Sequence, residues 1–151
     1  MPKNLFFNVL PSNGHVYRYR LEVLYRERHL PTVLSIFFCT VKYTKVEGKG
    51  LVMGLNRTNC YDFDYNLGKL QYVSHHNGDF TKPGFRWADT RIAQFEHDKI
   101  RDEHRAQARK TAQRVYDYFQ EEKLKSNDPH WQEEHEPFLS PLETILAAEK
   151  D

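Results

Sequence analysis

The segment 89–125 constrains this chain most, because it runs without a single proline or glycine. It is rich in Ala, Arg, Gln, Glu and Lys, which all favour helix. A helix of about 35 residues is about 50 Å long, which exceeds the body of a small domain. Asp89 suits the N-cap of such a helix, and Lys123 and Lys125 suit its C-terminal dipole. The sequence therefore predicts one long helix that packs on the remaining chain or projects from it.

The middle of this predicted helix, residues 101–109, has almost nothing to bury. Its arginines, Arg101, Arg105 and Arg109, are four residues apart and share one helix face. Like charges at this spacing repel by about a few tenths of a kcal/mol per pair, and bound phosphates would relieve that repulsion. The alternative is a solvated face neutralised by acidic neighbours between residues 98 and 103. The apolar positions towards the end of the helix are Ala108, Ala112, Val115, Tyr118 and Phe119.

Alternating apolar and polar residues before residue 80 predict a series of short β-strands. The clearest strand is 15–26, where tyrosines and aliphatic residues point one way while Arg18, Arg20 and Arg26 point the other. One face of this strand is therefore apolar, and the other is solvent-exposed and basic. The other strands are expected at 4–10, 32–46, 51–55, 61–65 and 69–73.

These elements predict an α+β fold in three parts. Residues 1–80 form an N-terminal antiparallel, barrel-like β-body, since many short strands joined by tight turns favour a strongly curved sheet or small barrel. Residues 81–125 supply a loop and the long helix. Residues 126–151 form an acidic tail with a short helix at 141–149.

The short helix of the tail has a recognisable start. Ser140 and Glu143 form a capping box, and Pro141 suits the first helical position. The apolar stripe of this helix consists of Leu142, Ile145 and Leu146. Because isolated short helices are marginal in water, this stripe must dock on the body or on a partner protein.

Charge is divided unevenly along the chain, although its total is only +1. Residues 1–80 carry 10 basic and 6 acidic side chains, residues 81–125 carry 11 and 8, and residues 126–151 carry 1 and 7. This asymmetry suggests an anionic partner, an internal mask over a basic surface, or both. If the tail is a mask, its removal after Lys125 is expected to leave the β-body folded and to tighten binding of nucleic acid.

Few residues suggest catalysis or metal binding. The chain lacks the P-loop, G-x-G-x-x-G, G-x-S-x-G and C-x-x-C motifs, so no catalytic residue and no cofactor is predicted. His75, His76 and Asp79 lie close enough in sequence to approach a metal if Asp62 and Asp64 join them in space. Solvated polar residues are the simpler interpretation, and no metal site is assigned.

The cysteines and the apolar runs indicate in which cellular compartment the protein is expected. Cys39 and Cys60 lie in strand-like stretches without ligands at zinc spacing, which favours buried thiols in a reducing compartment. The apolar run 33–41 is too short to span a bilayer, and nothing resembles a signal peptide. We therefore expect a cytoplasmic protein without a membrane partner.

The span 34–73 resembles the second half of a WYL domain, a small SH3-like or Sm-like barrel of bacterial and phage-associated regulators. The resemblance rests on the strand–turn–strand 41–55 and on the aromatic strand that begins at Tyr61. The chain has Gly50-Leu51-Val52 in place of the name-giving Trp-Tyr-Leu, and Asp62 and Asp64 in place of paired arginines. The resemblance thus implies a small barrel and carries no ligand site to this chain.

Two classes of function remain. The first is a non-enzymatic nucleic-acid-binding or regulatory module. Its candidate binding residues are Arg18, Arg20, Arg26, Arg101, Arg105 and Arg109. The second is an assembly or inhibitor protein, such as a phage- or virus-associated one, that docks a protein or a second copy of itself. It would use the long helix and the tail residues Leu142, Ile145 and Leu146.

Overall fold

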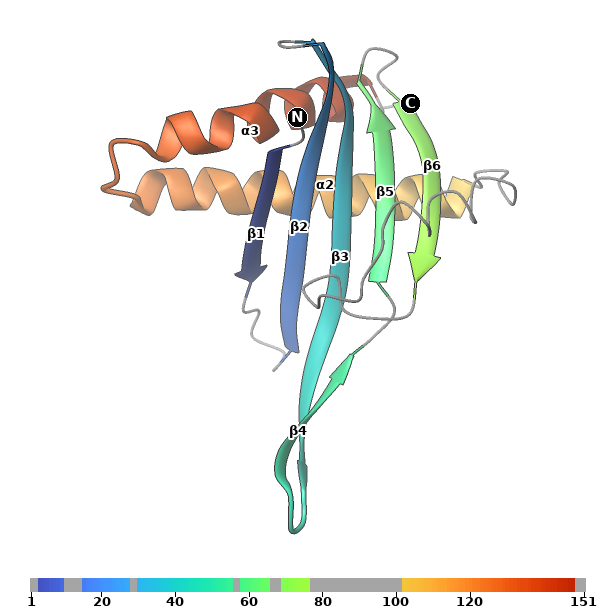
Figure 1. The fold of residues 1–151 in the computed structure, drawn as a ribbon, viewed down its shortest axis with the longest axis vertical. Helices are drawn as coiled ribbons and strands as arrows, with labels where there is room; N and C mark the ends of the chain where they lie inside the picture. The colour runs from blue at the N-terminus through green and yellow to red at the C-terminus, as the bar shows by residue number, and fades with distance from the viewer. Residues whose placement is uncertain are drawn as a thin grey trace.

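The computed structural model describes residues 3–9, 15–27, 30–55, 58–65, 69–76 and 102–148. Six antiparallel strands form one sheet, and two helices lie across one of its faces (Figure 1). The strand order is β1-β2-β3-β5-β6, and β4 pairs with β3 outside this path.

All six predicted strands are present, with bounds close to the predicted ones. They are β1 (Lys3–Val9), β2 (His15–Glu27), β3 (Leu30–Val46), β4 (Gly50–Leu55), β5 (Thr58–Asp64) and β6 (Lys69–His76). β3 is the longest, at 17 residues, and pairs with three other strands. Val33 to Phe38 pair with β5, while Val41 to Val46 pair with β4. The sheet is therefore organised around β3.

The sheet is open, which corrects the prediction of a barrel-like body. β1 and β6 are the first and the last strand in this order, and no pairing joins them among the described residues. A sheet must bury its apolar face against another layer or against itself. Here two helices supply that layer, so the sheet buries its apolar face without closing.

The helix α2 (Asp102–Lys125) agrees with the second part of the predicted long helix. Residues 89–101, with the expected N-cap Asp89, lie outside the described residues. The buried residues of α2 are Ala108, Thr111, Ala112, Val115 and Phe119. Their spacing of three or four residues presents one apolar stripe to the sheet and to the second helix.

The second helix, α3 (Trp131–Ala148), begins well before the short helix predicted at 141–149. Asp128 marks its start, since the Asp128 carboxylate accepts a hydrogen bond of 2.9 Å from the His130 backbone N–H. Pro137 and Pro141 lie inside the helix, although a proline removes a donor and crowds the preceding turn. The prediction was wrong here because it placed Pro141 at the first turn, where proline is best tolerated.

α3 completes the main apolar core between the helices and the sheet. Its large buried residues are Trp131, Phe138, Leu139, Leu142, Ile145 and Leu146. The predicted partner-binding residues Leu142, Ile145 and Leu146 are only 0%, 1% and 8% exposed. A partner protein would have to displace α3 to reach them, so the stripe packs on this chain's own body.

Candidate functional site

The two faces of the sheet differ, as the alternation along β2 predicted. Tyr19, Leu21 and Val23 belong to the core beneath the helices, whereas Arg18 and Arg20 lie on the opposite face. The sheet therefore separates these two arginines from every arginine of α2. Arg18 and Arg20 therefore form no continuous surface with Arg105 and Arg109.

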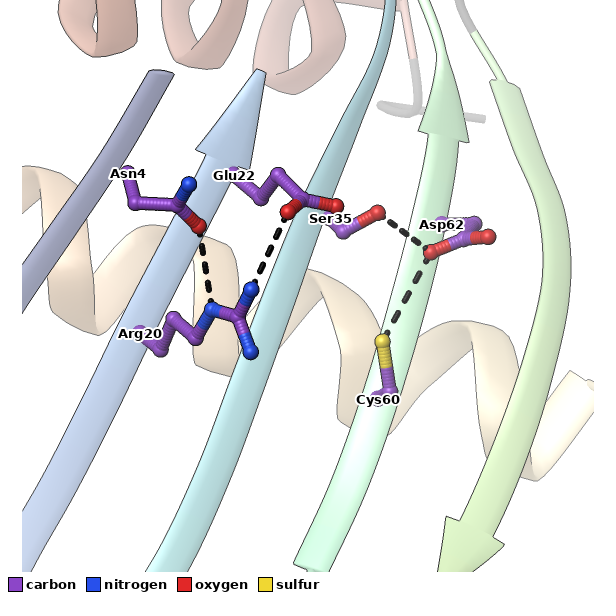
Figure 2. Close-up of polar contacts among 6 residues, drawn as sticks. All are labelled: Asn4, Arg20, Glu22, Ser35, Cys60 and Asp62. Carbon is purple, nitrogen blue, oxygen red and sulfur yellow. Dashed lines mark hydrogen bonds and ion pairs between the residues drawn. The ribbon is translucent and has the colours of Figure 1, made fainter. Parts of the chain in front are cut away.

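Arg20 is packed into the face away from the helices (Figure 2). Its guanidinium donates hydrogen bonds to Asn4 Oδ1 at 3.0 Å and to Glu22 Oε2 at 3.1 Å. The same group lies 4.8 Å from the Phe37 ring centroid and 5.5 Å from that of Phe6. Only 18% of the Arg20 side chain is exposed, so a phosphate would have to compete with the Glu22 carboxylate for it.

A second polar group lies beside Arg20 on this face. The Ser35 hydroxyl donates to Asp62 Oδ1 at 2.7 Å, and the Cys60 thiol lies 3.6 Å from the same oxygen (Figure 2). Ser35 is 0% and Asp62 is 2% exposed. The residue that pairs with His76 is Thr58, four residues along β5 from Asp62, or about 13 Å at strand spacing. This register keeps Asp62 away from His76, one of the histidines for which a metal was considered but not assigned.

The other predicted arginines have different surroundings. Arg105 is exposed on α2. Arg109 Nη1 donates a hydrogen bond of 3.0 Å to the Leu146 carbonyl oxygen near the end of α3, where a positive charge complements the helix dipole. Arg101 lies outside the described residues, and so does the side chain of Arg26.

The tail is docked on this chain, but not as the predicted mask. Trp131 is 8% exposed, and its ring stacks on His135 with centroids 4.1 Å apart. α3 shares the face of the sheet that carries α2. Arg18 and Arg20 lie on the other face, so α3 does not cover them.

A cavity of about 250 Å³ lies where α2 crosses β3 and β5. The sheet contributes Phe38, Asn59 and Tyr61, and α2 contributes Gln107, Lys110, Thr111 and Arg114. The lining thus combines two cations, two amides, two hydroxyls and two aromatic rings. None of these described lining residues is a carboxylate, so the cavity favours an anionic ligand.

Arg114 joins this cavity to the aromatic surface beside it. Its guanidinium carbon lies 5.3 Å from the Phe38 ring centroid and 5.8 Å from that of Tyr17. The two rings meet edge to face at 5.4 Å. Arg114 and Lys110 are both exposed on α2, and Phe38 and Tyr17 are half-buried. Cations and aromatic rings are therefore presented together at the border of the helix and the sheet.

The stripe of arginines spaced by four does not point to this site, because the cations of the cavity belong to other positions of α2. Gln107, Lys110 and Arg114 lie beside the buried stripe of α2, at the same helical spacing. Polar residues that flank a buried stripe sit at the edge of the contact with the sheet. Their position beside the buried stripe was therefore the feature of the sequence that could have indicated this site.

The tyrosines next to the cavity are held in their neutral form. Burial raises the pKa of Tyr19 to about 12, and the Arg114 guanidinium opposes this shift only in part. Burial also raises the pKa of Tyr61, although its hydrogen bond with Thr111 acts in the opposite direction. Both phenols therefore remain neutral over the physiological range of pH and serve as hydrogen-bonding groups.

We expect the buried Tyr19 phenol to make the protein sensitive to alkali. The unfolded state loses this proton near pH 10 and the folded state near pH 12, so the stability it contributes is present below pH 10 and is lost between these values. Tyr19→Phe should reduce the fall in melting temperature over this interval, measured by circular dichroism. Tyr17→Phe is the matched control. Equally steep falls in wild type and Tyr19→Phe would contradict the assignment.

The described residues also bear on metal binding and on membrane spanning. Among the described residues, no three His, Cys, Asp or Glu side chains gather as a metal site. Neither described helix is long and apolar enough to cross a lipid bilayer. Cys39 and Cys60 are buried and are not joined in a disulfide.

Comparison of the chain with models of known protein families found no match, and neither did comparison with curated proteins or with solved structures.

Proposed function

We propose that this protein binds single-stranded nucleic acid where α2 meets β3 and β5, without catalysing a reaction. Non-specific binding of single strands combines cations that follow the phosphates with aromatic rings on which bases stack. Lys110 and Arg114 supply the cations, and Phe38 and Tyr17 supply the rings. The site thus lies on the helix-bearing face and not on the face of Arg18 and Arg20.

Each part of the site has a role that follows from its chemistry. The exposed Arg114 guanidinium offers a planar surface for a base and a charge for a phosphate. Lys110, one helical turn away, would contact the adjacent phosphate. Asn59 and Gln107 carry amides, which can hydrogen-bond the edges of an unstacked base. The cavity volume of about 250 Å³ suits a single base or phosphate group better than a duplex.

The position of Arg114 is the observation that carries this proposal. The guanidinium of Arg114, an exposed residue, lies over two aromatic rings and hydrogen-bonds the neutral Tyr19 phenol, beside a cavity whose described lining holds no carboxylate. By contrast, Arg20 is already paired with Glu22, and Arg109 already binds the Leu146 carbonyl. Arg114 and Lys110 are therefore better candidates for contacting a phosphate than Arg20 and Arg109.

Removing both cavity cations should weaken binding strongly. We expect Lys110→Gln with Arg114→Gln to raise the Kd for a fluorescent oligothymidylate or oligouridylate by about tenfold or more, since each charged hydrogen bond is worth about 1.5–3 kcal/mol. The slope of log K against log salt should fall by about 1.4, because each phosphate contact contributes about 0.7 for single strands. Fluorescence anisotropy over a salt series measures both.

A matched control separates the cavity from general charge. Arg105→Gln with Lys123→Gln removes the same charge from exposed positions of α2 outside the cavity. It should leave Kd within about twofold, apart from the weak effect of net charge that salt screens. Equal losses in the two double variants would mean that α2 acts only through its overall charge. If the wild-type protein binds no oligonucleotide, the proposal is wrong.

A further inference from the structure

The hairpin of β3 and β4 extends beyond the rest of the sheet as a two-stranded arm (Figure 1). The pairing of β3 with β2 ends at Lys42, and its pairing with β5 ends at Phe38. From residue 43 to residue 46, β3 pairs with β4 alone among the described strands. The turn at the tip is well formed, since Gly48 and Gly50 both have positive φ and Lys49 N–H donates to the Val46 carbonyl at 3.1 Å.

The tip of this arm carries apolar side chains that nothing described covers. Leu51 is 71% exposed, Val52 is 39% exposed and Val46 is 37% exposed. Leu51 is opposite Lys45 on one face of the hairpin, whereas Val46 and Val52 lie on the other. A two-stranded hairpin is marginally stable in water by itself, and β4 presents its outer edge. An arm of this kind gains stability when a partner covers it.

An open groove of about 670 Å³ lies elsewhere on the same chain, between the end of β2 and the start of α3. Tyr25, Pro129 and Pro137 give it an apolar floor. Gln132, Glu133 and Glu136 make its remaining lining polar and acidic. No lysine or arginine is among these described lining residues.

We propose that the arm of one copy of this chain docks into the groove of a second copy. Leu51 would cover the apolar floor, while Lys45 and Lys49 would approach Glu133 and Glu136. The groove of the same molecule is out of reach, because the arm leaves one end of the sheet and α3 crosses near the other (Figure 1). The contact therefore joins different surfaces of the two copies, and it can build an open chain, a ring or a closed dimer in which the two arms are exchanged reciprocally.

The chemistry of both surfaces favours protein over nucleic acid as the occupant. Aliphatic side chains such as Leu51 offer no ring for stacking a base. The two glutamates of the groove would repel phosphates, and they complement Lys45 and Lys49, which outnumber the one acidic residue of the arm tip, Glu47. A single hairpin buries less area than a standard interface of about 1,200–2,000 Å², so the assembly should be reversible and dependent on concentration.

Sedimentation velocity and light scattering on nuclease-treated full-length protein test the proposal. The average mass of the wild type should rise with concentration. Leu51→Thr with Val52→Thr keeps residues that favour strands and should remain monomeric. Glu133→Lys with Glu136→Lys should also remain monomeric. A mixture of these two variants should form a dimer and stop there, since it retains one intact arm facing one intact groove.

Leu124→Thr is the matched control, because Leu124 is 87% exposed but belongs to neither the arm nor the groove lining. This variant should assemble as the wild type does. Three results would each overturn the proposal: a wild type that is monomeric throughout, assembly that disappears with nuclease treatment, or a mixture of the two variants that stays monomeric. The last result would point to a symmetric contact or to another surface. Melting curves confirm that each variant is folded.

Discussion

Removing residues 126–151 should unfold this protein instead of freeing a masked β-body. The deletion takes away six large side chains that are at most 8% exposed in the main core: Trp131, Phe138, Leu139, Leu142, Ile145 and Leu146. Burial of each such side chain contributes about 1.5–3 kcal/mol, so the six together contribute on the order of 10 kcal/mol. That loss is comparable with the whole stability of a typical domain, about 5–15 kcal/mol.

A charge-only variant distinguishes the loss of core packing from the loss of tail charge. Full-length protein with Glu133, Glu134 and Glu136 changed to Gln keeps every buried residue of α3, and all three glutamates are exposed. We expect it to melt cooperatively near the wild-type temperature, whereas the deletion should show no cooperative transition by circular dichroism. A deleted protein that kept a cooperative melt would show that the sheet and α2 are stable without α3.

Phe119→Ala should cause the largest loss of stability of any single truncation on α2. Phe119 is 1% exposed and joins three elements. Its ring centroid lies 5.2 Å from that of Phe7 on β1, 6.5 Å from Trp131 and 5.2 Å from His135 on α3. Phe→Ala in a core costs about 3–5 kcal/mol, from lost burial and from the cavity left behind.

Urea unfolding of Phe119→Ala and of Leu124→Ala compares two large residues of the same helix. Leu124 is exposed, so its truncation should change the free energy of unfolding by less than about 0.5 kcal/mol. Phe119→Leu should fall between the two, because it keeps part of the apolar volume. A loss for Phe119→Ala below about 1 kcal/mol would mean that β1, α2 and α3 are not joined through this ring.

The strands and the buried stripe of α2 were predictable because each follows a local period. Alternation of residue type separated Tyr19 from Arg18 and Arg20, and the helical spacing from Ala108 to Phe119 gave the buried face of α2. The hairpin tip was signalled by glycines, which the two positive φ angles require. Local patterns of this kind need no knowledge of the partner surface.

The remaining features depend on contacts between distant parts of the chain. Whether β1 meets β6 decides between a barrel and an open sheet, and neither strand encodes that choice. The start of α3 was misjudged because prolines usually end helices, whereas here the surrounding side chains are buried. The cavity joins Phe38 and Asn59 to Lys110 and Arg114 only through the angle at which α2 crosses the sheet.

The order in which the core is assembled has a consequence for synthesis of the chain. α3 is the last described element to leave the ribosome, and it supplies much of the core. Chains are made at about 5–20 residues per second. The apolar face of the sheet therefore remains uncovered by α3 for a time on the order of seconds. During that interval, the sheet presents aromatic and aliphatic side chains to solvent or to chaperones. Slow translation between residues 126 and 148 should therefore favour aggregation of the nascent chain.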